Sequence, residues 1–141
     1  MKHKISVEDQ SFRSAFETCS IFPEEFNHRA HIRLAYIYLC EDELDAAYQK
    51  MRRSLQMFLN HHGVDPAKYH ETMTRAWIMA VRYFMGRSSS AASADNFIES
   101  NPELLDSKIM LTHYSNEALF SDEARSVFVE PDLDPIPKHG R

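Results

Sequence analysis

The sequence predicts an all-α fold in a single domain, and three observations lead to this prediction. The chain has 141 residues, a usual length for one domain that buries a core without disulfides or metal. Only 3 glycines and 6 prolines are present, whereas a β-sandwich needs many turns. Apolar residues recur at helical spacing along most of the chain. We expect a bundle of three or four main helices, then short C-terminal helices and an extended proline-rich tail.

The first two helices are predicted from their caps and apolar stripes. Ser6 can cap the first helix, and Glu8 and Asp9 in its first turn suit the positive end of the helix dipole. Asn27 can cap the second helix, whose wide apolar arc indicates a place near the middle of the fold. That arc contains Ile32, Ala35, Tyr36 and Leu39.

The third and fourth helices are bounded by strong stop and start signals. We expect the third helix from about Asp42 to His62, with Gly63 ending it. Asp65–Pro66 combines a capping residue with a proline and predicts the start of the fourth helix, which Gly86 should end. One side of that helix carries Tyr69, Met73, Trp77, Ala80, Val81 and Phe84.

The remaining elements are shorter. Residues 87–94 form a serine- and alanine-rich stretch that we predict to be a mobile loop. Short helices should follow, with starts at Asp95, Asn101–Pro102, Ser115 and Ser121. Three prolines exclude a regular helix in the tail, where Leu133 and Ile136 can anchor an extended strap. We predict one domain over residues 1–137 and a flexible end over 138–141.

Composition argues against several classes of partner. The net charge is -5, so no strong basic field exists to attract nucleic acid. Cys19 and Cys40 match no zinc or CxxC spacing, and we interpret them as small buried residues in a reducing compartment. No stretch approaches the roughly 18 apolar residues that a membrane span needs, and the N-terminus has no signal-peptide pattern. We expect a soluble, cytoplasmic protein without a membrane partner.

The candidate site follows from topology. Short loops should make neighbouring helices antiparallel, so the second and fourth helices should run parallel and begin at the same end of the bundle. His28 and His31 lie in the first turns of the second helix. His70, Glu71 and Thr74 lie in the first turns of the fourth. Residues three or four apart share a helix face, so these side chains should converge.

Three interpretations of this site compete. In the first, His28, His31 and His70 bind a divalent transition metal such as zinc or iron, with one coordination position open. The spacing is no recognised metal signature, because HET at residues 70–72 is not part of HExxH. In the second, two helix starts and nearby arginines bind a small anionic molecule, and a histidine can act as general acid or base. In the third, the histidines only hold helix ends together.

The ligand-binding prediction extends to two further side chains. Arg75 can add positive charge, and His113 can join the site if the C-terminal helices fold back across it. The full candidate set is His28, His31, His70, Glu71, Thr74, Arg75 and His113. Our leading prediction is binding of a small anionic ligand or a metal ion, with enzymatic activity left open. The alternative is a non-catalytic helical interaction module, for example a homodimer, whose histidines are structural.

Three segments carry a resemblance to other proteins. They are FNHRAHIRLA at residues 26–35, KYHETMTRAW at 68–77, and HYS…LFS…ARSVFVEPDLDPIP from 113 to 137. With these segments the chain resembles a group of small bacterial proteins described as hypothetical or of unknown function. The resemblance covers most of the chain in the same order and implies a stand-alone helical domain. It implies no reaction, no cofactor and no catalytic residue.

Overall fold

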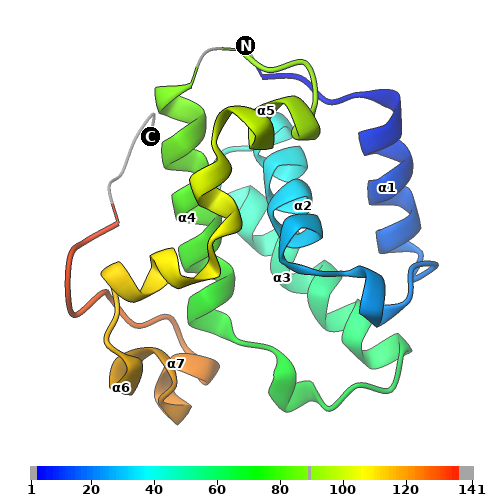
Figure 1. Ribbon diagram of the computed structural model, residues 1–141. Helices are drawn as coiled ribbons and strands as arrows, with labels where there is room; N and C mark the ends of the chain where they lie inside the picture. The colour runs from blue at the N-terminus through cyan, green and yellow to red at the C-terminus, as the bar shows by residue number, and fades with distance from the viewer. Residues whose placement is uncertain (1–2, 89, 137–141) are drawn as a thin grey trace.

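The computed structural model describes residues 3–88 and 90–136, and within these ranges the protein is helical with no strand (Figure 1). This confirms the predicted all-α single domain. The elements in order are α1 (Val7–Glu17), η1 (Pro23–Glu25), α2 (His28–Glu41), α3 (Leu44–His61), η2 (Pro66–Lys68), α4 (Glu71–Arg87), α5 (Ala94–Ser100), η3 (Pro102–Leu105), η4 (Ser107–Thr112), α6 (Asn116–Leu119) and α7 (Asp122–Ser126), where η marks a 3-10 helix.

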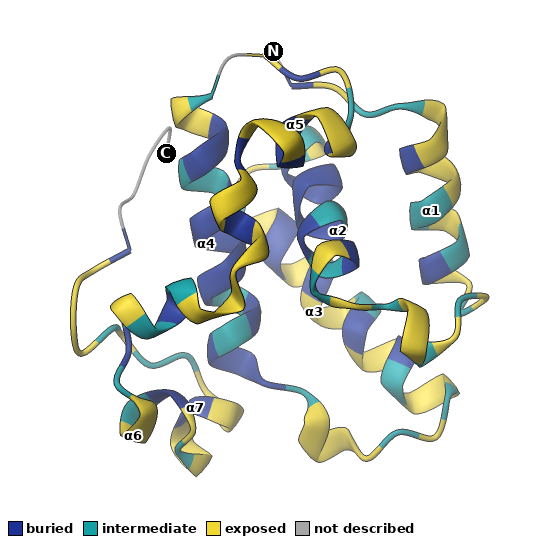
Figure 2. Cartoon of the chain, viewed as in Figure 1, coloured by how far each residue is buried: buried dark blue, intermediate teal, exposed yellow. Residues whose placement is uncertain are grey.

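Helix α2 lies at the centre of the bundle and packs against α3 and α4, which also contact each other. Figure 2 shows α2 and α4 mostly buried, whereas α1 and α3 alternate buried with exposed positions. Figure 1 also shows α2 and α4 running in one direction and α3 in the other. The expected parallel arrangement of the second and fourth helices is therefore confirmed. None of the described helices has the length and apolarity to cross a membrane.

Asp9 joins three helices through its buried carboxylate, of which 1% is exposed. One oxygen accepts hydrogen bonds from the backbone N–H of Ser6 at 3.0 Å and of Ala94 at 2.8 Å. The other accepts from Nε of Arg33 on α2 at 3.0 Å. Burial alone would raise the pKa of Asp9, but these donors outweigh it and hold the pKa below its usual value. The sequence predicted Asp9 only as a first-turn residue whose charge suits the helix dipole.

Most predicted helix boundaries are confirmed by cap geometry. The side chain of Ser6 accepts from the N–H of Asp9 at 3.0 Å, and that of Asn27 accepts from Ala30 at 2.9 Å. Ser115 and Ser121 cap α6 and α7 in the same way. Gly63 follows α3 with a φ of 67°, the left-handed conformation that glycine adopts without strain.

The start of the fourth helix differs from the prediction. Asp65 does cap a turn, since its carboxylate accepts from the N–H of Ala67 at 2.9 Å, but this turn is only the 3-10 helix η2. Tyr69 and His70 are then extended, and α4 begins at Glu71. The helix ends at Arg87 rather than Gly86. The predicted start of this helix was therefore about one helical turn too early. His70, which was expected inside the first turns, is the N-cap residue.

The predicted loop and tail are held by backbone contacts. In the 87–94 segment the carbonyl of Ala91 accepts from the N–H of Lys4 at 2.9 Å, and Ser93 rather than Asp95 caps α5. Ile136 is buried as expected, but the Leu133 side chain is 52% exposed and anchors the tail only through its N–H, which donates to His113. The predicted flexible end at 138–141 lies outside the described residues, as does Ser89.

Candidate functional site

His70 caps α4 with its imidazole and thereby uses both ring nitrogens. Nδ1 accepts from the N–H of Met73 at 3.1 Å, while Nε2 lies 2.7 Å from the carbonyl oxygen of Leu119. These partners require a neutral ring with the proton on Nε2, which donates to Leu119. Burial lowers the pKa of His70, and the charge of Arg125 lowers it further. The side chain thus ties the start of α4 to a carbonyl at the end of α6.

His28 and His31 lie together in the first turn of α2. Nε2 of His28 donates to the carbonyl oxygen of Leu104 at 2.8 Å, and its ring meets Trp77 edge-on with the centroids 4.7 Å apart. His31 differs, because its Nε2 is buried and has no hydrogen-bond partner in the part of the chain that the structure describes. Burial, together with the nearby His28, lowers the pKa of His31 to about 4. His31 is therefore neutral at physiological pH.

These two histidines line a cavity of about 360 Å³ between the start of α2, α4, η4 and α6, which we call the histidine cavity. Its polar lining consists of His28, His31, Ser107 and Lys108. Its apolar lining consists of Met73, Trp77, Met110, Leu111, Leu119 and Phe120. The cavity thus combines polar side chains with aromatic, aliphatic and thioether surface.

The other predicted site residues lie elsewhere. The hydroxyl of Thr74 donates to the carbonyl of His70 at 2.8 Å and is buried inside α4. Arg75 faces α3, where it contacts Asp45 at 3.4 Å and stacks on Tyr48. His113 donates through Nδ1 to the tail carbonyl of Asp134 at 2.7 Å. None of these three residues lines the histidine cavity.

Glu71 also faces away from the histidine cavity. Its buried carboxylate accepts from Nε of Arg52 on α3 at 3.0 Å. Burial raises the pKa of Glu71, and the charge of Arg75 offsets part of that increase. This carboxylate belongs to the wall of another cavity, between α3 and α7.

The expected three-histidine metal cluster is not formed. The described part of the chain contains no group of three or more His, Cys, Asp or Glu side chains placed to hold a metal ion. The two nitrogens of His70 and Nε2 of His28 are occupied by backbone groups. Only His28 and His31 of the predicted trio line one cavity. The donor set therefore does not fit the zinc or iron that the sequence had suggested.

Several lining residues were not predicted as site residues. Met73 and Trp77 belong to the apolar stripe of the fourth helix, for which the sequence favours core packing over the wall of a pocket. Lys108 and Phe120 lie in the short C-terminal elements, where no sequence pattern distinguishes a cavity wall from an exposed turn. They reach the site only because this segment folds back over the start of α4 (Figure 1).

Fold and site together define an all-helical single-domain protein with a partly apolar cavity beside its helix starts. Comparisons with family models, with curated proteins and with solved structures found no match for the chain. The resemblance to hypothetical bacterial proteins therefore stays a prediction.

The depressed pKa of His31 predicts a specific dependence of stability on pH. Between about pH 6.5 and 4 the unfolded chain protonates this ring while the folded protein does not. The protonation of His31 does not affect the unfolding free energy above pH 6.5. Below that pH it lowers the unfolding free energy increasingly, until the pH reaches about 4. We expect the loss to reach up to about 3 kcal/mol.

Denaturant titrations of the wild type and His31→Leu at several pH values measure this effect. Subtracting the two curves removes the other titrating groups, including His70, whose lowered pKa acts in the same direction. A difference in unfolding free energy that stays constant between pH 7 and 4 would show that His31 is not protected from protonation.

Proposed function

We propose that this protein binds a small amphipathic organic anion in the histidine cavity. The observation that supports the proposal is the buried Nε2 of His31, which has no hydrogen-bond partner among the described residues although His31 lines a cavity. A buried polar group without a hydrogen bond costs about 1–3 kcal/mol, and nearly all such groups are paired. A bound molecule with one hydrogen-bonding group would pair this nitrogen once the His31 ring turns toward the cavity, because the nitrogen itself is buried.

The lining indicates the chemistry of that molecule. The ammonium of Lys108 and the starts of α2 and α4 favour a negative group, because the helix dipole is positive at an N-terminus. The Trp77 ring and the methionines favour an apolar body. A volume of about 360 Å³ suits a small molecule rather than a polymer. A carboxylate attached to a short aliphatic or aromatic group meets all three requirements.

The role of His31 in this proposal is that of a neutral hydrogen-bond partner. An imidazole with a pKa of about 4 is a weak base near neutral pH and carries no positive charge. His31 therefore contributes a directional hydrogen bond to a ligand, while Lys108 contributes the positive charge. Binding, rather than proton transfer, is the function that this geometry favours.

A second candidate is the helical interaction module, in homodimeric form. It is favoured by His70 and His113, whose hydrogen bonds hold the fold together and need no ligand. It is also favoured by Phe120, which is 50% exposed at the edge of the histidine cavity. Sedimentation over a range of protein concentrations separates the two functions. A protein that is monomeric at all concentrations would argue against a homodimeric interaction module.

The test of ligand binding uses hexanoate and phenylacetate, each paired with its neutral amide, and follows backbone amide shifts by NMR. We expect the carboxylates to shift residues around the cavity and to bind at least about tenfold more tightly than the amides. His31→Leu should abolish this binding while raising the unfolding free energy at pH 7 by about 1 kcal/mol, because it removes an unpaired buried nitrogen.

His61→Gln is the matched control, since His61 is exposed at the end of α3. It should change neither binding nor stability. Equal binding of acids and amides would overturn the anionic preference. Full binding by a folded His31→Leu protein would overturn the site itself.

A further inference from the structure

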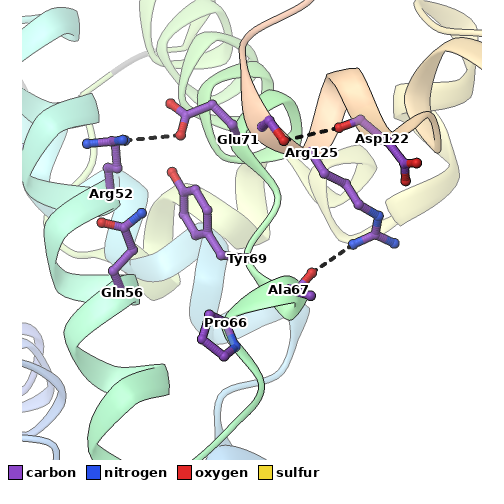
Figure 3. A pocket seen from close by; sticks show the side chains of 9 residues that line it. Arg52, Gln56, Pro66, Ala67, Tyr69, Glu71, Asp122 and Arg125 are labelled. Atoms are coloured by element: carbon purple, nitrogen blue, oxygen red, sulfur yellow. Dashed lines mark hydrogen bonds and ion pairs between the residues drawn. The ribbon is translucent and has the colours of Figure 1, made fainter.

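A second cavity, of about 430 Å³, shares no lining residue with the histidine cavity. It lies between α3, η2, the first residue of α4 and α7 (Figure 3). Its lining consists of Arg52, Gln56, Pro66, Ala67, Tyr69, Glu71, Asp122, Arg125 and Ser126. A smaller space of about 260 Å³ has as its lining Gln56, Leu59, Asn60, Pro66 and Tyr69. The two spaces share three lining residues and follow α3, so they form one elongated groove, which we call the α3 groove.

The α3 groove has two long walls of different structure. One wall is the helix α3, from which Figure 3 shows Arg52 and Gln56 reaching into the groove. The facing wall is the segment between α3 and α4, where Pro66 begins η2 and Tyr69 has an extended backbone. Figure 3 shows Arg125 of α7 on the far side of this segment, well away from the α3 side chains. Contacts with a ligand along α3 therefore come from α3 itself and from Pro66 and Tyr69.

Three polar side chains follow one another along the α3 wall at intervals of four residues. They are Arg52, Gln56 and Asn60, and residues four apart share one face of a helix. A rise of 1.5 Å per residue separates successive members by about 6 Å along the helix axis. Gln56 and Asn60 are exposed, and neither side-chain amide bonds to another residue in the described part of the chain. The α3 wall thus presents evenly spaced hydrogen-bonding groups that are open to a ligand.

Arg52 is held in place at one end of this row. Its Nε donates to Oε1 of Glu71 at 3.0 Å, and Glu71 is 6% exposed. A guanidinium carries five N–H donors, so this bond leaves others for a ligand. The two opposite charges balance each other, so this end of the groove offers directed donors without a strong net field. An uncharged ligand with carbonyl groups suits such a surface.

An extended polypeptide repeats at nearly the same interval as the polar row on α3. A strand rises 3.2–3.4 Å per residue, and its alternate residues present their N–H and C=O groups to the same side. These groups therefore recur about every 6.5 Å. A side-chain amide has both donors and an acceptor, so it can pair with the N–H and C=O of one such residue. Gln56 and Asn60 match two alternate residues of a peptide, and Arg52 matches the carbonyl of the next.

The smaller part of the α3 groove adds apolar surface beside this row. Leu59 is half-buried there, and Pro66 and the ring of Tyr69 face it. Side chains of an extended peptide alternate between two faces, so an aliphatic side chain on one face can lie against this surface while its backbone pairs with α3. Backbone pairing supplies affinity in this mode of recognition, and the apolar space supplies selectivity.

From this arrangement we infer that the α3 groove binds an uncharged, extended peptide segment of about four residues, which a partner protein supplies. Gln56 and Asn60 pair with the backbone of alternate residues, Arg52 donates to a further carbonyl, and an aliphatic side chain packs against Leu59. The inference is independent of the ligand proposed for the histidine cavity, because the two sites share no lining residue.

The test titrates the full chain with the capped tetrapeptide acetyl-Leu-Ala-Leu-Ala-amide and follows backbone amide signals by NMR. This peptide is uncharged, and its two leucines lie on one face when it is extended. It should shift the signals of Gln56, Asn60 and Tyr69. Acetyl-leucinamide engages one side-chain amide instead of two, so it should bind at least about tenfold more weakly.

Two N-methylated forms of the tetrapeptide test the two-residue repeat. One carries methyl groups on the nitrogens of its first and third residues, and the other on those of its second and fourth. A methylated nitrogen cannot donate, and only alternate residues face α3. One form should therefore lose about tenfold or more in affinity, while the other binds like the unmodified peptide.

Three variants assign the binding to the α3 groove. Gln56→Ala and Asn60→Ala remove exposed side chains without a partner among the described residues, so both proteins should fold as the wild type does and bind the tetrapeptide about fivefold more weakly. Gln49→Ala is the matched control, because Gln49 is an exposed amide on α3 that lines neither part of the groove. Its affinity should equal that of the wild type.

Four results would overturn the inference. Equal affinity of the two N-methylated forms would show that the backbone is not read at alternate residues. Acetyl-leucinamide binding as tightly as the tetrapeptide would make the groove a site for a small molecule. An equal loss of affinity in Gln49→Ala would remove the assignment to the groove. No amide shift with the tetrapeptide up to about 10 mM would exclude a site of useful affinity.

Discussion

Replacing Asp9 with alanine should lower the free energy of unfolding by about 4 kcal/mol. The buried carboxylate accepts three hydrogen bonds that connect α1, α2 and the start of α5. Its removal leaves the guanidinium of Arg33, 23% exposed, without its ion-pair partner and leaves two N–H groups unpaired. Removing one partner of a buried ion pair leaves the other charge uncompensated, and this costs far more stability than the intact pair contributes.

Guanidinium titration at pH 7 measures this loss, and Asp95→Ala is the matched control. Asp95 is also a carboxylate paired with an arginine, but both partners are exposed, so its loss should cost less than about 1 kcal/mol. Asp9→Asn keeps an acceptor and should fall between the two. Similar losses for Asp9→Ala and Asp95→Ala would refute the role assigned to burial.

The sign of the pH effect at Asp9 is opposite to that at His31. The folded pKa of Asp9 lies below its ordinary value of 3.8, so its contribution is complete above that pH and is lost as the pH falls through the folded pKa. Asp9→Asn should flatten this acid limb of the stability curve. His31 acts between about pH 6.5 and 4, so the two effects separate along the pH axis.

Replacing His70 with alanine should lower the free energy of unfolding by about 3 kcal/mol, the second largest effect that we expect. The substitution removes the cap from the N–H of Met73 and leaves the carbonyl of Leu119 without its donor. The sequence placed His70 in the candidate binding site. Backbone groups occupy both of its ring nitrogens, so we expect the substitution to affect folding rather than ligand binding.

Two variants check the assignment for His70. His70→Asn restores a good capping side chain but cannot reach Leu119 in the same way, so it should recover about 1 kcal/mol. His113→Ala removes a histidine with one bond to the tail and should cost less than about 1.5 kcal/mol. A fully stable His70→Ala protein would show that the imidazole does not cap α4.

The bundle was predictable because its signals are local. Ser6, Asn27 and Gly63 mark helix ends through contacts within a few residues. Short loops then fix the direction of successive helices, so the parallel arrangement of α2 and α4 followed from connectivity alone. The predicted α-helix start at Asp65–Pro66 was wrong for another reason. That pair fits a 3-10 turn as well as an α-helix, and its sequence does not distinguish them.

The candidate site was less predictable because its contacts are distant in sequence. Nε2 of His70 bonds to a backbone carbonyl 49 residues further along the chain, and no side-chain type identifies such a partner. Asp9 accepts a hydrogen bond from Ala94, 85 residues away at the start of α5, where the sequence predicted the end of a mobile loop. Topology did bring His28 and His31 near α4. It could not show that Glu71 faces α3 instead, since that depends on Arg52.

The segment over residues 107–126 forms one wall of both cavities. Its η4 and α6 portions line the histidine cavity and its α7 portion lines the cavity between α3 and α7, while His70 bonds to its Leu119 carbonyl from the start of α4. Movement of this shared wall changes two volumes together. Thermodynamic linkage then makes any coupling between the cavities reciprocal: a ligand that tightens binding in one by moving the wall is itself bound more tightly, by the same factor, when the other is filled.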